Sequence, residues 1–479
     1  MNGIHILLLI LLYFGALLSI SLFIGKKHSG NAAFFLGNRK SPWYVVAFGM
    51  IGSSLSGVTF VSVPGMVGKF DMTYMQMVLG FLLGYAVIAF VLLPVYYRLS
   101  VTSIYTYLDK RIGKYAYKTG AGFFLLSRTI GAAARLYVAV LILQTYVFDA
   151  WKVPFTLTAA GFLLMIWLYT HKSGVRAIVW TDLLQSFFLI TALIILLRQV
   201  AGGLHLDFSG IVASITESPH SRIFVFDDWH SRQNFFKQFI SGVFVTIAMT
   251  GIDQEMMQKN LSCRTLGEAK KNICTYSLFF IPVNFLFLCI GVLLLNYASL
   301  QGITLPDSGD DILPALISAG YFGVPALLFF VLGIIAVTFA SADSALTGLT
   351  TSICVDILNT PGHTARKARQ IRLNVHLALS LAFIAIMLIF RAINDTSIID
   401  AIYMIASYTY GPLLGLFAFG ILTKRKTRDR AVPWICIVSP VLCFAVNEGL
   451  KASVNYQFGY ELLIINALLV FSGLLVFRK

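Results

Sequence analysis

Long apolar stretches alternate with short polar ones along the whole chain. Thirteen apolar runs are long enough for a helix to cross a bilayer, which takes about 20 residues. They lie at approximately 4–24, 43–66, 73–97, 119–148, 153–170, 176–200, 236–258, 272–298, 321–357, 370–392, 397–421, 431–450 and 459–477. Because backbone groups inside a bilayer must bond within their own segment, each run is predicted to be helical. The pattern predicts an all-α integral membrane protein with thirteen transmembrane helices.

The composition supports this prediction. Of the 479 residues, 58% are hydrophobic and 12% are charged, whereas soluble domains contain about 25% charged residues. The net charge of +15 could indicate nucleic acid as a partner, but the basic residues fall in short loops between apolar runs. We therefore expect no nucleic-acid partner. A single transmembrane domain is predicted over 1–479, with a core at about 43–421 and additional helices at 4–24, 431–450 and 459–477.

The distribution of Lys and Arg predicts the orientation, because these residues are enriched in cytoplasmic loops. Most of the 36 basic residues gather in alternate loops, for example at 110–118, 366–372 and 424–430. Lys259 is assigned to another of these loops. The bias places the N-terminus outside and the C-terminus inside a multi-pass cell-membrane protein.

Four ionisable residues lie deep within predicted spans, where each costs a few kcal/mol and is a functional candidate by default. They are Asp182, Asp343, Arg128 and Arg135. The two arginines are seven residues apart, two helical turns, so they share one helix face. A structural salt bridge, for instance between Arg135 and Asp182, is the alternative interpretation.

The second span contains the run Gly52-Ser53-Ser54-Leu55-Ser56-Gly57, which concentrates poor helix formers at mid-depth. The ninth span carries a comparable run at 338–344. We predict unwound stretches whose carbonyls can hold an ion, in preference to small-residue packing faces. Carbonyl, hydroxyl and carboxylate oxygens suit a hard cation such as Na⁺.

Asp253 and Glu255 lie near the inner end of the seventh span. At that position a solvated helix cap is the expected role for both carboxylates.

Three other classes of function are alternatives to a carrier. An intramembrane aspartyl protease needs two membrane aspartates, but the chain lacks the GxGD sequence around the second, and Asp343 lies in SADS instead. A sensor would need an output module, and the chain ends at Lys479 directly after the last span. A channel stays open on sequence grounds, and saturable uptake would distinguish a carrier from it.

Six sequence stretches resemble the sodium:solute symporter family, which includes sodium–glucose, sodium–proline and sodium–sialic acid cotransporters. They are SSLSGVTFVSVPG, TSIYTYLDKR, GVRAIVWTDLLQ, TGIDQEMMQKNLS, SADSAL and GPLLGLFAFGILTKR. The match extends over about 4–478 and is most similar to bacterial sialic acid symporters, through the S-x-x-T-F run at Ser56 to Phe60. The resemblance implies a LeuT-type core of two inverted five-helix repeats, spans two to six and seven to eleven.

The resemblance also implies sodium ligands. The family's main site corresponds to carbonyls of Gly52, Leu55 and Val337 and to hydroxyls at two positions that hold Ala340 and Ser341 here. One hydroxyl is therefore missing, and Asp343 one turn on could compensate. A second sodium site, found in some members, corresponds to Asp182, Asp343 and Ser344. The number of sodium ions, one or two, stays open.

For the substrate, the sialic acid members use positions that correspond to Ser54, Ser56 and Thr59, together with an arginine that clamps a carboxylate. That arginine position falls on Gly131, with Arg128 and Arg135 each about one turn away. A sugar-contacting glutamine position falls on Val78, and Gln76 lies two positions from it.

The resemblance thus implies sodium-coupled symport of a small organic solute, such as a carboxylate or a sugar acid like sialic acid. A neutral sugar, polyol or amino acid is the alternative cargo. The implied partners are this solute, Na⁺ and the lipid bilayer. We expect no organic cofactor and no obligate protein partner.

Overall fold

A computed structural model describes residues 3–25, 30–171, 174–393, 398–454, 456 and 458–478. Over these residues the protein is helical and contains no β-strand. The α-helices are α1 Gly3–Gly25, α2 Asn31–Leu36, α3 Trp43–Ser54, α4 Gly57–Phe70, α5 Tyr74–Val87, α6 Leu93–Leu99, α7 Thr106–Arg111, α8 Lys114–Leu143, α9 Phe155–Thr170, α10 Gly174–Gly203, α11 Phe208–Thr216, α12 Phe235–Thr246, α13 Gln254–Asn260, α14 Leu266–Gln301, α15 Gly309–Ser318, α16 Gly323–Ser352, α17 Ala365–Ile393, α18 Ile398–Leu422, α19 Val432–Val454 and α20 Leu462–Val476.

The all-helical prediction is confirmed, with apolar helices of spanning length. Within the described residues, eight helices are long and apolar enough to cross a membrane, or ten if each of two bent helix pairs forms one span. Three shorter apolar helices comprise Phe155–Thr170, Ala406–Leu422 and Leu462–Val476. The start of the predicted run at 397–421 and the basic residues Lys26, Lys27, Lys172 and Lys479 lie outside the described residues.

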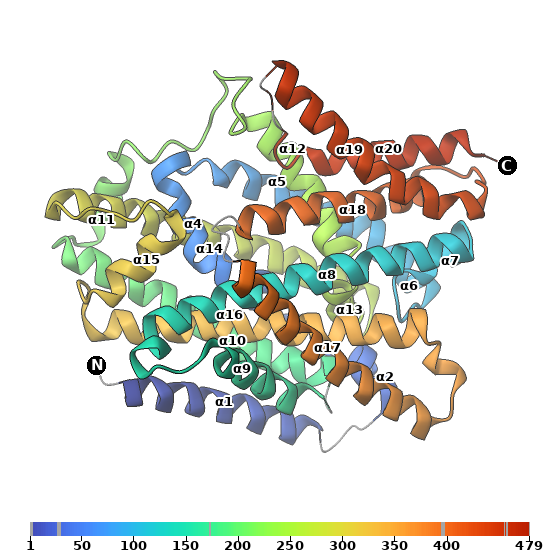
Figure 1. Ribbon diagram of the computed structural model, residues 1–479, viewed down its shortest axis with the longest axis horizontal. Coiled ribbons are helices and arrows are strands. Elements are labelled where there is room, and N and C mark those ends of the chain that lie inside the picture. The colour runs from blue at the N-terminus through green and yellow to red at the C-terminus, as the bar shows by residue number, and fades with distance from the viewer. Residues whose placement is uncertain are drawn as a thin grey trace.

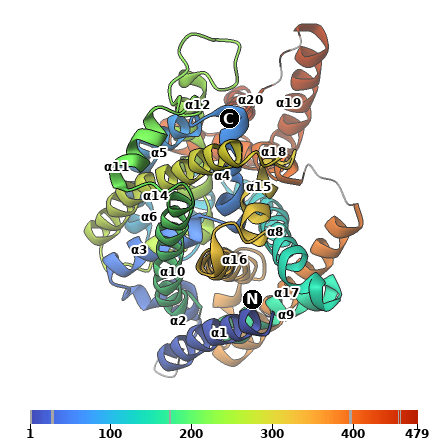
Figure 2. The same cartoon turned by 90° about the vertical axis from the view of Figure 1, so that its left-hand side faces the viewer.

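The longest helices run side by side along the long axis of the molecule (Figure 1). Helix α16 lies in the middle, where Figure 2 views it nearly end-on with α1, α9, α10 and α17 around it. From Phe330 to Ser352 every α16 side chain is buried. The periphery instead exposes large apolar side chains, among them Leu12 on α1 and Trp434 on α19. Such exposed apolar surface suits contact with lipid acyl chains.

Glycines allow some helices to touch backbone to backbone. A Cβ atom on Gly80 of α5 would lie 2.1 Å from the Phe239 carbonyl oxygen of α12. Conversely, a Cβ on Gly242 would lie 2.2 Å from the Met77 carbonyl oxygen. Close approach through small residues is the usual way in which transmembrane helices associate, and here it fixes α5 against α12.

Among the described residues, two helix pairs are bent at a short break, and the sequence predicted only one of these breaks. Helices α3 and α4 form a pair bent by 63°, as the Gly52–Gly57 run predicts. The second bent pair is 235–251 with α13, at 72°, and belongs to the seventh span.

The prediction of an unwound stretch at 338–344 is wrong, because α16 is continuous through it. That segment holds no Gly or Pro. Its hydroxyls can also bond within the helix, as the Ser341 Oγ does in donating to the Thr338 carbonyl oxygen at 3.1 Å.

Candidate functional site

The break between α3 and α4 leaves backbone groups without helical partners. Leu55 and Ser56 are extended, with φ/ψ of −80°/155° and −130°/167°. Ser56 caps α4: its Oγ accepts from the Thr59 N–H, and the Thr59 Oγ1 accepts from the Ser56 N–H, both at 3.3 Å. The last carbonyls of α3 and the first N–H groups of α4 therefore meet in the middle of the span, with no continuing helix to bond them.

The two helix ends at this break have opposite electrostatic character. The C-terminal end of α3 carries partial negative charge from its unpaired carbonyls, and the N-terminal end of α4 carries partial positive charge. The first suits a cation and the second an anion. The arrangement is the one that transporters with discontinuous helices use for both ligands.

Helix α16 contacts the break closely. A Cβ on Gly57 would lie 3.0 Å from the Thr338 Oγ1 and 2.7 Å from the Ala139 Cβ, so only glycine fits there without a shift. The Thr338 Oγ1 is buried and has no hydrogen-bond partner among the described residues. Sequence reasoning missed Thr338 as an individual ligand candidate, because only the packing brings it to the break. Val337 and Ser341, one turn apart, share a helix face.

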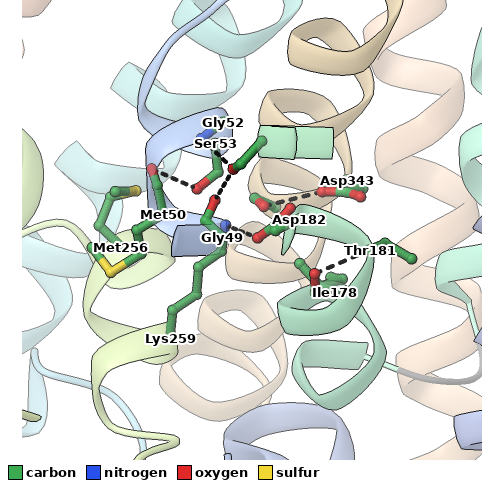
Figure 3. A network of polar contacts seen from close by, with 12 residues as sticks. Gly49, Met50, Gly52, Ser53, Ile178, Thr181, Asp182, Met256, Lys259 and Asp343 are labelled. Carbon is green, nitrogen blue, oxygen red and sulfur yellow. Dashed lines mark hydrogen bonds and ion pairs between the residues drawn. The ribbon is translucent and has the colours of Figure 1, made fainter. Parts of the chain in front are cut away.

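Helix α3 is also fastened to α10 next to Asp182. The Gly52 N–H donates to the Ser186 Oγ at 2.8 Å, and that hydroxyl donates to the Gly49 carbonyl oxygen at 3.2 Å (Figure 3). A Cβ on Gly49 would lie 3.0 Å from the Asp182 Cβ. The acidic side chain thus lies directly against the helix that ends at the break.

The Asp182 carboxylate is fully buried and forms an ion pair, but its partner is not an arginine. The Lys259 Nζ of α13 donates to the Asp182 Oδ2 at 2.6 Å, as Figure 3 shows. The suggested salt bridge with Arg135 is therefore wrong. The assignment of Lys259 to a basic inner loop is also wrong, since this residue is 2% exposed.

Asp343 lies in the same buried region. Its Oδ2 accepts from the Tyr169 hydroxyl at 2.7 Å, and its Oδ1 accepts from the Ser344 Oγ at 3.0 Å. Figure 3 shows its side chain near that of Asp182. The three predicted second-site residues, Asp182, Asp343 and Ser344, are therefore neighbours in the fold.

Arg128 is held by acidic partners at the second interruption. Its Nε donates to the Glu255 Oε2 and lies 3.9 Å from the Asp253 Oδ2. Asp253 caps α13, accepting from the Glu255 N–H at 2.9 Å, and the Tyr410 hydroxyl donates to its second oxygen at 2.6 Å. Asp253 is therefore a cap, as expected, but both carboxylates are buried, so the prediction that they are solvated is wrong.

Arg135 has a different environment. Its Nε donates to the Gly131 carbonyl oxygen of its own helix at 3.1 Å, and no carboxylate among the described residues forms an ion pair with it. The side chain is half-buried and lines a cavity. This guanidinium is thus available to an anion.

The cavity lies against the break and has a volume of about 150 Å³. Five of the six predicted substrate residues line it: Ser54, Ser56, Thr59, Arg128 and Arg135. Aromatic and methionine side chains supply much of the remaining wall, namely Tyr74, Met77, Phe81, Tyr85, Met249, Met256, Tyr276, Phe280, Tyr410 and Tyr460. An apolar wall with a few convergent polar groups is typical of a small-molecule site.

Gln76 does not line this cavity. Its side-chain nitrogen donates to the Gln233 carbonyl oxygen at 2.8 Å and to the Thr73 carbonyl oxygen at 3.2 Å, and its oxygen accepts from the Val225 N–H at 3.1 Å. Fully buried and bonded through both polar atoms, Gln76 anchors the 217–234 segment to α5.

Comparison with known proteins identifies relatives of this chain. The model of the sodium:solute symporter family matches residues 34–435. The sodium/sialic acid symporter SiaT of Proteus mirabilis is 24% identical, covering 93% of this chain and 90% of SiaT. The sodium/sialic acid symporter NanT of Aliivibrio fischeri is 23% identical, covering 88% and 83%.

Some relatives are longer. The human sodium/iodide cotransporter is 25% identical over 84% of this chain, and the chain spans 63% of that protein's length. The chain likewise spans 65% of the length of the sodium-dependent multivitamin transporter of Oryctolagus cuniculus.

The fold is also that of a solved transporter. A Na⁺-coupled sialic acid symporter, in a substrate-bound outward-open state, superposes with a TM-score of 0.84 over 98% of both chains at 20% identity. The family model matches most of the chain's length, and the fold agrees with it. The chain belongs to the sodium:solute symporter family.

Proposed function

We propose that this protein is a sodium-coupled symporter of a small carboxylate-bearing solute in the cell membrane. The observation that carries the proposal is the cavity, which brings the interrupted helix pair α3/α4 and the unpaired Arg135 side chain to one space. One edge of that space offers oxygens to a cation, and another offers a guanidinium to an anion.

The proposed architecture is a single domain over 1–479 with thirteen transmembrane helices and two inverted five-helix repeats, N-terminus outside and C-terminus inside. In support, each proposed repeat begins with an interrupted helix, α3/α4 in the first and α12/α13 in the second. The first and last described residues also lie at opposite ends of the long axis (Figure 1), as an odd number of crossings requires.

We place the principal sodium site between the end of α3 and α16. The proposed ligands are the carbonyl oxygens of Gly52, Leu55 and Val337 and the Ser341 hydroxyl. Ala340 supplies no hydroxyl at the remaining position. The unpartnered Thr338 Oγ1 and the nearby Asp343 carboxylate are the oxygens able to replace it. A ligand set made only of oxygens is the kind that hard cations prefer.

Arg135 is the proposed carboxylate clamp, with Ser54, Ser56, Thr59 and the α4 N-terminus as further contacts. Arg128 touches the cavity but is neutralised by Glu255 and Asp253, so its proposed role is structural. The names of the relatives fit an anionic cargo, since sialic acid and iodide both carry negative charge.

Coupling follows from shared binding. Sodium at the break fixes the end of α3 and the turn into α4, and the same turn contacts the solute. A conformation that binds both is favoured by both, and such coupling typically amounts to about 1–3 kcal/mol. The sodium gradient then drives accumulation of the solute.

A thermal-stability screen of the purified protein tests this proposal and identifies the cargo. Sialic acid, short monocarboxylates, a neutral sugar, a polyol and a neutral amino acid are each added in NaCl or in choline chloride. A ligand that binds the native state stabilises it more, the further its concentration exceeds its Kd. We therefore expect a carboxylate to raise the melting temperature, and to do so far more in sodium. If only neutral compounds stabilise, or sodium makes no difference, the proposal is wrong.

A further inference from the structure

The short helix α13 places a buried lysine next to the two aspartates Asp182 and Asp343. All seven of its residues are buried, and Lys259 reaches Asp182 with its Nζ 2.6 Å from the carboxylate oxygen (Figure 3). No other ion pair of Lys259 is formed within the described part of the chain. An ammonium this deep is tolerated only with a partner charge, so Lys259 and Asp182 form one unit.

Lys259 enters a region with further carboxyl and hydroxyl oxygens. The Asp182 Oδ1 is buried and has no hydrogen-bond partner among the described residues. The Asp343 side chain lies near that of Asp182 in the same buried region (Figure 3). The Ser344 hydroxyl is 3.0 Å from Asp343. This region therefore holds two buried carboxyl groups, and one ammonium is already paired with the first of them.

The position of the ammonium limits what else can bind to these carboxylates. The Lys259 Nζ lies 2.6 Å from the Asp182 Oδ2, so it already occupies an oxygen of a carboxylate that the second sodium site would need. A Na⁺ ion bound to the same carboxylate would lie close to the ammonium, and two like charges near each other repel strongly away from water.

We propose that the Lys259 ammonium takes the place of a second coupling cation, so that this transporter binds one Na⁺ per transport cycle. The inference rests on the proposed sodium-coupled function and adds its stoichiometry. The lysine stays with the protein, and only the sodium of the α3/α16 site is exchanged between the two sides of the membrane.

Equilibrium binding of ²²Na⁺ to the purified wild-type protein tests the inference without any substitution. We expect one Na⁺ per chain, and solute uptake that depends on sodium concentration with a Hill coefficient of about one. Two bound ions and a Hill coefficient near two would overturn the inference while leaving sodium coupling intact. No bound sodium at all would instead overturn the proposed function on which it rests.

Two substitutions of the same residue sharpen the test. Lys259→Met removes the ammonium and leaves both carboxylates, so we expect a second ²²Na⁺ ion to bind. Lys259→Arg keeps the positive charge and is expected to bind one, like the wild type. If Lys259→Met still binds a single Na⁺ with wild-type affinity, the Lys259 ammonium does not take the place of a second sodium ion. Should this variant fold poorly, the wild-type stoichiometry decides the question alone.

Discussion

Breaking the Asp182–Lys259 pair on either side should destabilise the protein by about 3–5 kcal/mol, because it leaves a charge buried without its partner. Asp182→Leu leaves the Lys259 ammonium without a partner charge, and Lys259→Met leaves the Asp182 carboxylate without one. The double variant Asp182→Leu/Lys259→Met buries neither charge and should recover most of the loss, since apolar replacements of buried ion pairs are often neutral. Thermal unfolding in sodium-free choline chloride measures the cycle.

The two single variants should differ in their response to salt. Adding NaCl should restore stability to Lys259→Met, where a sodium ion can pair with the freed carboxylates. It should leave Asp182→Leu unchanged, because sodium cannot neutralise a stranded ammonium. Additive losses in the double variant, or equal rescue of both single variants, would show that the pair does not act as a unit.

Arg135→Ala should abolish high-affinity binding of the carboxylate solute. Truncating one partner of a buried charge pair costs about 2–5 kcal/mol, which corresponds to a loss of roughly 30-fold to several thousand-fold in affinity. Arg135→Lys should retain part of the affinity, because a lysine keeps the charge but cannot bond both carboxylate oxygens in the guanidinium geometry. Isothermal titration of the purified variants with the solute in NaCl provides the measurement.

An exposed arginine supplies the matched control for Arg135. Arg222 forms an ion pair with Asp227 on the surface segment before α12, where such pairs contribute little, so Arg222→Ala should bind the solute normally. Arg128→Ala should instead lower stability, because it strands Glu255. Unchanged affinity in Arg135→Ala would indicate a neutral cargo or a different clamp.

Much of the molecule could be predicted from local sequence. Apolar runs of spanning length indicate helices because a bilayer leaves no alternative. The break at Gly52–Gly57 could be predicted because glycine and serine concentrate there and Ser56 can cap the next helix. The cavity-lining serines, threonine and arginines followed from the family resemblance, and the packing brings them together.

What could not be predicted depends on partners distant in sequence. The polar run at 254–260 is typical of an exposed loop end. Its burial depends on packing against distant helices, and Asp182 of α10 supplies the charge that compensates Lys259. Gln76 resembled a cavity residue by spacing, but its partners belong to the 217–234 segment. Likewise, Ser and Thr in α16 do not break the helix, since hydroxyls such as that of Thr351 bond to a carbonyl one turn back.

Uptake of the carboxylate solute into proteoliposomes tests the central claim most directly. The vesicles contain purified protein and potassium buffer, and are diluted into either NaCl or choline chloride of equal strength. We predict concentrative, saturable uptake only with the inward sodium gradient, collapsing when a sodium ionophore dissipates it. Uptake of equal rate and extent in choline chloride would contradict a sodium ion bound beside the cargo at the broken helix.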